Sequence, residues 1–189
     1  SVDLDTQSKV ISFQLGSSLF GIDILDIQQI IRATKATRLF KAAPFIEGII
    51  DLRGEVIPLI DLGKRLDMAG AELSDEARII VIELNERRIG LLVDSVSEIL
   101  TLTNNQRASA PSDVAGIKTE FIQEISKTKD GLLIVLDLEK VLYPEGSPSL
   151  HRPESRSKVG GEIPQTKSTR PPEEARPQMK AEEAEETQS

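Results

Sequence analysis

The chain has 189 residues and a net charge of −8, and it contains no cysteine, no tryptophan and a single histidine. The lack of cysteine excludes disulfides and thiolate metal sites, and one histidine leaves almost no material for a catalytic triad or a histidine-based zinc site. An acidic chain repels phosphate backbones and no apolar run could span a bilayer, so we expect a cytoplasmic protein with no nucleic-acid partner, membrane insertion, metal or cofactor.

Short β-branched runs separated by turn residues occupy residues 10–143, after a polar stretch, residues 1–9, that predicts a flexible N-terminus. In chain order the predicted strands are VISFQL, LFGID, EGIIDL, EVIPLI, RIIVIEL, RIGLLVD, SEILTL and LLIVLDL. ILDIQQII predicts a helical turn that leads into a strand, and LTNNQ predicts another turn. DLGKRL and DLEKVL each begin with aspartate, a good N-cap, and predict two short helices.

Composition changes abruptly near Tyr143. All five phenylalanines and the only tyrosine lie at or before this position, whereas seven of the ten prolines lie at or after residue 144. The last residues contain too few large apolar side chains to offset the entropy of ordering them. We therefore expect residues 144–189 to form a disordered tail rich in proline and glutamate, either a solvated tail or a tether.

An internal repeat is visible in the predicted domain. FQLGSSLFGIDILDIQQII aligns without a gap with IELNERRIGLLVDSVSEIL, which matches Gly21 with Gly90. EVIPLIDLGKRL then aligns with GLLIVLDLEKVL, which matches Asp61 with Asp137. The common order of the blocks favours duplication and predicts a mainly β fold of two small barrels packed side by side. The first barrel covers about 10–70 and the second about 78–143, a crossing of the chain between them is left open, and a groove between them is the expected binding site.

The pair Arg53–Gly54 joins two strand-like runs. No Walker or dinucleotide-binding loop is present, so a phosphate cradle is excluded, and Gly54 is predicted to turn a hairpin with positive φ. A hairpin tip does not require arginine, so Arg53 is either a solvated turn charge or a residue that contacts a partner. Asp61 and Asp137 are explained as N-caps without any catalytic role.

The segment FIEGIIDLRGEVIPLIDLGKRL resembles the signature of the CheW family of chemotaxis coupling proteins. ISFQLGSSLFGIDILDIQQII is similar to the family's first hairpin, and VIELNERRIGLLVDSVSEIL to its second-half hairpin, so the resemblance covers residues 10–143. It implies two five-stranded SH3-like barrels and a non-catalytic adaptor that couples methyl-accepting chemoreceptors to the histidine kinase CheA in a two-component signalling array. The implied partners are the cytoplasmic tips of the receptors and the regulatory domain of the kinase, with self-association in the array as a further option.

The resemblance also implies a set of partner-binding residues, with Arg53 supplying charge-assisted hydrogen bonds. The family's pattern often has glutamate at the position of Gln29, so a salt bridge there is in doubt. Ile24 and Ile27 are either an apolar rim that faces the receptor or ordinary core residues, and Gly90 is expected to have a structural role. The full set is Arg53, Ile24, Ile27, Gln29, Gly48, Gly90 and Ile99.

The sequence bears on three other functions. The same adaptor fold can serve a non-flagellar motility or second-messenger pathway, which the sequence does not distinguish. A β-barrel that binds a small ligand or an oligonucleotide is disfavoured, because aromatic residues make up only 3% of an acidic chain. An enzyme is disfavoured by the lack of a nucleophile-and-base set.

Overall fold

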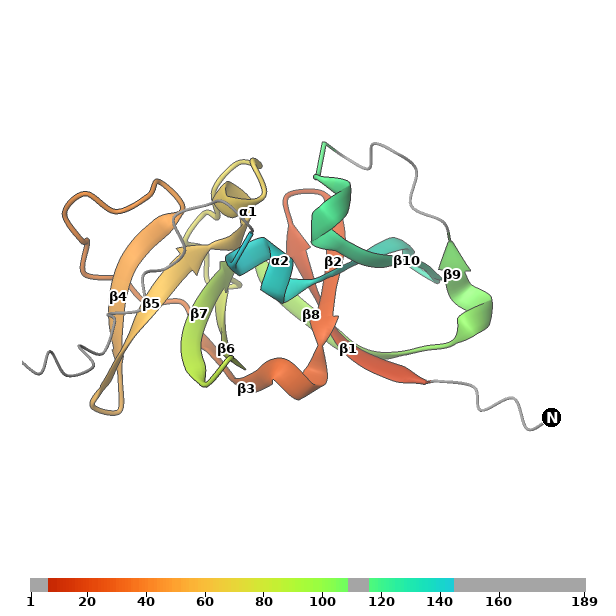
Figure 1. Cartoon of the computed structure of the whole chain (residues 1–189), viewed down its shortest axis with the longest axis horizontal. Helices are drawn as coiled ribbons and strands as arrows, with labels where there is room; N and C mark the ends of the chain where they lie inside the picture. The colour runs from red at the N-terminus through yellow and green to blue at the C-terminus, as the bar shows by residue number, and fades with distance from the viewer. Residues whose placement is uncertain (1–6, 109–115, 145–189) are drawn as a thin grey trace, which may run out of the picture. The chain divides into compact units, whose positions relative to one another are not determined.

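The computed structural model describes residues 7–108 and 116–144, and there the protein is mainly β, as predicted (Figure 1). The predicted flexible N-terminus lies outside the described residues up to residue 6, whereas residues 8 and 9 already belong to the first strand. The predicted disordered tail lies outside them from residue 145 onward. The strands are β1 (Ser8–Leu15), β2 (Ser18–Asp23), β3 (Ile27–Arg32), β4 (Ile46–Leu52), β5 (Glu55–Asp61), β6 (Arg78–Leu84), β7 (Arg87–Val93), β8 (Ser95–Leu102), β9 (Arg107–Ala108), β10 (Ile122–Thr128) and β11 (Gly131–Leu136).

The helices are short. They are η1 (Ile24–Asp26), α1 (Leu62–Arg65), η2 (Asn104–Gln106), η3 (Thr119–Phe121) and α2 (Leu138–Leu142), where η marks a 3₁₀ turn. The predicted caps are confirmed, because the carboxylates of Asp61 and Asp137 accept hydrogen bonds from the backbone N–H of Lys64 (3.0 Å) and Lys140 (3.2 Å). The two predicted turns are η1, which leads into β3, and η2. In the described ranges no helix is long and apolar enough to cross a membrane.

The strands form two sheets that exchange parts of the chain. Sheet A has the order β8-β1-β2-β11-β10-β9, and sheet B has the order β3-β6-β7-β5-β4. The hairpins are antiparallel, whereas β2 pairs with β11 and β5 with β7 in parallel. The division at about residues 70–78 therefore does not separate the sheets, since β1 and β2 pair with strands of the second half. The chain crosses between the two sheets, which the sequence had left open.

The register of the strands supports the duplication. Gly21 on β2 lies opposite Val135 on β11, and Gly90 on β7 lies opposite Leu59 on β5, so matched residues have matched partners. Each sheet thus takes a hairpin from one half and the remaining main strands from the other half. Two copies of one unit that exchange equivalent strands produce this arrangement, because the exchange preserves every strand–strand contact.

The predicted pair of barrels is confirmed only as two sheets. Sheet B has five strands, and sheet A has a sixth, two-residue strand, β9. Among the described residues no strand pairing joins β3 to β4 or β8 to β9, so closure into SH3-like barrels stays a prediction.

The largest apolar cluster lies between the sheets. It combines residues of β1 and β2, such as Phe13 and Phe20, with residues of β6 and β7, such as Ile82 and Leu91, and with both α-helices. Smaller clusters lie on the opposite face of each sheet, because successive residues of a strand point to alternate faces. The prediction of a partner-binding groove between two barrels is wrong for the centre of this junction, because buried side chains fill it. A hollow of about 530 Å³ opens at its margin, beside α2.

Candidate partner-binding surface

The β4–β5 turn presents Arg53. Arg53 (φ 53°) and Gly54 (φ 86°) both have left-handed backbone, the conformation of the two-residue turns that match the twist of a hairpin. The N–H of Gly54 donates to the carboxylate of Asp51, a residue of β4, at 2.8 Å, and this hydrogen bond stabilises the turn. Arg53 is exposed, and no ion pair or hydrogen bond of its guanidinium is recorded among the described residues. The predicted positive φ of Gly54 is confirmed, and the guanidinium is available to another molecule.

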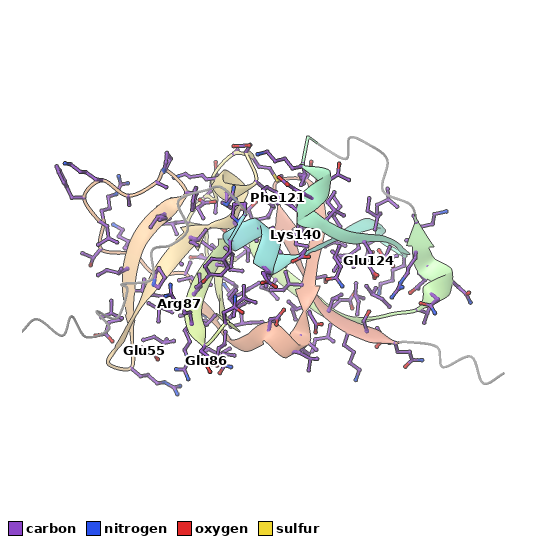
Figure 2. The ribbon with its side chains drawn as sticks, viewed as in Figure 1. Glu55, Glu86, Arg87, Phe121, Glu124 and Lys140 are labelled. Carbon is purple, nitrogen blue, oxygen red and sulfur yellow. The ribbon has the colours of Figure 1, made fainter. Side chains whose placement is uncertain are left out.

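Charged side chains surround this turn at one end of sheet B. Glu55, which begins β5, pairs with Arg88 on β7 at 2.7 Å, with both side chains about half exposed. The β6–β7 turn has left-handed backbone at Asn85 and Glu86. Because β5 and β7 run in parallel, both turns lie at the same end of the sheet, and Figure 2 shows Glu55 and Glu86 close together there. The result is a polar rim with Arg53 at its outer side.

The segment Ile24–Gln29 forms the other outer side of sheet B. The carboxylate of Asp23 caps η1 by accepting from the N–H of Leu25 at 2.9 Å. Ile24, Ile27 and Gln29 are half-buried, and Ile27 packs against the central cluster. Ile27 therefore contributes to the core and also leaves part of its side chain exposed at the edge of sheet B. Leu25, which sequence reasoning missed, is 87% exposed.

The electrostatics of η1 tie it to the second helix. Burial, reinforced by the nearby carboxylates of Asp23 and Asp137, raises the pKa of Asp26 above its ordinary value. Asp137 is the N-cap of α2, so η1 lies near the junction of the two sheets. The Gln28 amide donates to Glu83 on β6 at 2.8 Å and holds the start of β3 against its neighbour.

Ile99 lies on sheet A. It is 55% exposed on β8, where it pairs with Ile11 of the central cluster. Its counterpart in the repeat, Ile30 on β3, pairs with Ile80 of the same cluster and is also exposed. Since paired residues point to the same face, Ile30 and Ile99 extend the central apolar cluster to the outer strand of each sheet.

Gly48 and Gly90 are buried and serve packing. Gly48 lies at a β-bulge with φ 142°, and a Cβ there would overlap the backbone carbonyl of Thr37, which exchanges two 2.9 Å hydrogen bonds with Ile49. Both a β-bulge and a close approach of neighbouring backbone are therefore present at Gly48. A Cβ on Gly90 would lie 3.1 Å from the Leu59 side chain, which supports the structural role expected for it.

The predicted residues do not form one cluster. Ile24, Ile27 and Gln29 share one segment, and Arg53 belongs to the opposite outer side of the same sheet, beyond strands β6, β7 and β5. Ile99 lies on the other sheet. The described part of the chain places no group of three or more His, Asp or Glu residues where they could hold a metal ion. The arrangement offers two separated contact regions, a polar rim and an apolar strand edge.

Comparison with known proteins gives a consistent match. A family model described as the CheW-like domain matches residues 9–145. The chain is 35% identical over 133 residues to the chemotaxis protein CheW of Klebsiella aerogenes, covering 70% of this chain and 80% of that protein. It is 34% identical over 149 residues to the chemotaxis protein CheW of Bacillus subtilis, covering 79% and 96%. The crystal structure of the scaffolding protein TtCheW from Thermoanaerobacter tengcongensis superposes with a TM-score of 0.68 at 33% identity, covering 78% of this chain and 95% of that one.

Proposed function

The chain belongs to the CheW-like family of chemotaxis proteins, and on that premise we propose that it is a non-catalytic adaptor that couples methyl-accepting chemoreceptors to a CheA-type histidine kinase. It does so in the cytoplasm, where membrane-bound receptor arrays recruit it. Its partners are the cytoplasmic receptor tips and the regulatory domain of the kinase, and it self-associates within the array. We also propose that each sheet closes as an SH3-like barrel. The same adaptor role in a non-flagellar pathway is the alternative.

The observation that carries the proposal is the exposed guanidinium of Arg53 on a rigid turn. The turn is fixed by the hydrogen bond from the N–H of Gly54 to the carboxylate of Asp51. The backbone of the turn is therefore set before a partner arrives, so little loop entropy remains to be lost on binding. A planar guanidinium donates well to carboxylate or carbonyl groups, which suits recognition of a protein surface.

The apolar strand edge supplies the second part of the surface. On sheet B this edge consists of Leu25 on η1 and Ile30 on the outer strand β3, which both expose apolar side chains. Ile99 exposes a further one on β8, the outer strand of sheet A. A receptor helix that presents apolar side chains at helical spacing fits such an edge. Gln29, half-buried beside it, donates and accepts neutral hydrogen bonds only. We therefore assign receptor contact to this edge and assign Arg53 to the coupling between receptor and kinase.

The test compares Arg53→Ala with Arg88→Ala in arrays reconstituted from receptor, kinase and adaptor. Arg53→Ala is expected to lower receptor-dependent kinase activity about tenfold, because removing one charged hydrogen-bond partner at an interface costs about 1–3 kcal/mol. Its thermal unfolding should match the parent, because Arg53 is exposed. Arg88→Ala, on the same rim but in an intramolecular ion pair, is the control and should couple normally. Early melting of Arg53→Ala, or full coupling by it, would show that Arg53 is only a turn residue.

A further inference from the structure

The loop between β3 and β4 carries a local excess of positive charge. The chain has a net charge of −8, yet no acidic residue lies between Asp26 and Glu47. The same stretch contains four cations, Arg32, Lys35, Arg38 and Lys41. This loop leads into the start of β4, whereas Arg53 follows its end, so the two features lie at opposite ends of that strand (Figure 1).

Two large apolar side chains of the loop face solvent. Phe40 is 93% exposed and its neighbour Leu39 is 47% exposed. The loop is nevertheless held in place, because Thr37 exchanges two backbone hydrogen bonds with Ile49 on β4 and the N–H of Ile46 donates to the carbonyl of Ala43 at 2.9 Å. Single exposed apolar residues are common, but an adjacent pair on an anchored loop flanked by cations indicates a binding surface.

Two hollows lie beneath this loop. Their volumes are about 350 and 200 Å³, and both are lined by Arg38, Glu47 and Lys64. Lys64 pairs with Glu47 at 2.7 Å, and the hydrogen bond to Glu47 is the main cause of the raised pKa of Lys64. Leu39 lines the smaller hollow and Leu73, also exposed, lines the larger one.

We propose that this loop surface, formed by Lys35, Arg38, Leu39, Phe40 and Lys41, docks an acidic segment of a partner protein that carries large apolar side chains. Since Glu47 already neutralises Lys64, the cations left for the partner are those of the loop. Complementary charge would orient the segment, and its apolar side chains would pack on Phe40 and enter the hollow beside Leu39. Two hollows that share the Glu47–Lys64 pair in their lining offer room for apolar side chains, which favours a protein segment over the flat surface of an anionic membrane.

The binding assay measures fluorescence anisotropy of a labelled peptide of about twelve residues, composed of aspartate and glutamate around a central Leu-Phe pair, with the full chain. We expect saturable binding with a micromolar dissociation constant. The dissociation constant should increase as salt rises, because the loop charges are exposed and are screened by salt. Phe40→Ser and Arg38→Glu should each weaken binding about tenfold. Leu132→Ser, which removes another exposed apolar side chain on sheet A, should leave binding unchanged.

Several outcomes would overturn the proposal. One is that a peptide with two serines in place of the Leu-Phe pair binds as tightly as the parent peptide, which would show that charge alone accounts for binding. Others are no binding up to about 1 mM peptide, unchanged binding by Phe40→Ser and Arg38→Glu, and sedimentation with phosphatidylglycerol vesicles tighter than peptide binding. Phe40 and Arg38 are exposed, so their variants are expected to melt like the parent, and circular dichroism verifies this. Kinase coupling by Arg53→Ala is a separate readout, so the adaptor proposal and this one fail independently.

Discussion

Replacing Arg65 should weaken the junction of the two sheets more than any exposed charge would. Its guanidinium lies 5.1 Å from the ring centre of Phe45 and 5.0 Å from that of Phe121. Its Nε donates to the backbone carbonyl of Val141 in α2 at 2.8 Å. Phe45 precedes β4 of sheet B and Phe121 precedes β10 of sheet A, so one side chain of α1 ties both sheets to the second helix.

The magnitude follows from these contacts. Two cation–π contacts at a partly exposed site contribute about 1–2 kcal/mol together. The charged hydrogen bond contributes about 1–2 kcal/mol more, and its loss leaves the Val141 carbonyl without this donor. Burial lowers the pKa of Arg65, which reflects the cost of withdrawing the cation from water and offsets part of the gain. Arg65→Met, which keeps most of the apolar stem, should therefore lower the free energy of unfolding by about 2–4 kcal/mol.

Urea unfolding followed by circular dichroism measures this change. Arg65→Lys keeps the charge but loses the planar fork, so we expect a smaller loss than for Arg65→Met. Arg88→Met is the matched control, because its ion pair with Glu55 is solvent-exposed and should contribute no more than about 1 kcal/mol. If Arg65→Met destabilised the protein no more than Arg88→Met, the argument that Arg65 clamps the junction would be refuted.

Two further changes test the fold around the candidate surface. Gly48→Ala should cost more than about 3 kcal/mol in urea unfolding, because its Cβ would overlap the Thr37 carbonyl, whereas Gly54→Ala, with open space and only a positive φ, should cost about 1 kcal/mol. Asp26→Asn should stabilise the protein at neutral pH: a raised folded-state pKa means that stability is fully present below the ordinary value of 3.8 and is lost as pH rises through the folded pKa. The gain should therefore disappear as unfolding is measured toward pH values below 3.8, and a gain that persisted in acid would contradict the assignment.

Local signals in the sequence predicted most elements but not their partners. Alternating apolar residues and aspartate caps identify the hairpins and both α-helices, because those features depend on neighbours in the chain. Strand β10 was missed, since Glu124 and Ser126 interrupt its apolar pattern. The exchange of the β1–β2 and β6–β7 hairpins between the sheets depends on contacts between distant segments, which no local pattern records.

The candidate site was predictable to a similar extent. The exposure of Arg53 follows from its place in a two-residue turn, and the packing role of Gly90 follows from its repeat mate. The exposure of Leu25 and Phe40 could not be predicted, because an apolar residue in a loop is buried or exposed according to which distant segment covers it. Sequence reasoning therefore identified the charged turn and missed the most exposed apolar side chains.

The two repeats differ at the equivalent β4–β5 and β10–β11 turns, so duplication alone does not explain the sequence there. Lys129 occupies the position of Arg53 in the β10–β11 turn, and it lies 3.8 Å from Glu98 in an intramolecular ion pair. That turn also spans two residues, but the positive φ falls on Gly131, whereas in the β4–β5 turn both Arg53 and Gly54 have positive φ. A hairpin of this length can therefore be made in this protein without left-handed arginine and with its cation neutralised. Left-handed backbone costs more for arginine than for glycine, but Asn85 and Glu86 in the β6–β7 turn meet the same cost, so the adaptor proposal rests on the charge of Arg53, exposed and unpaired among the described residues, and not on its backbone.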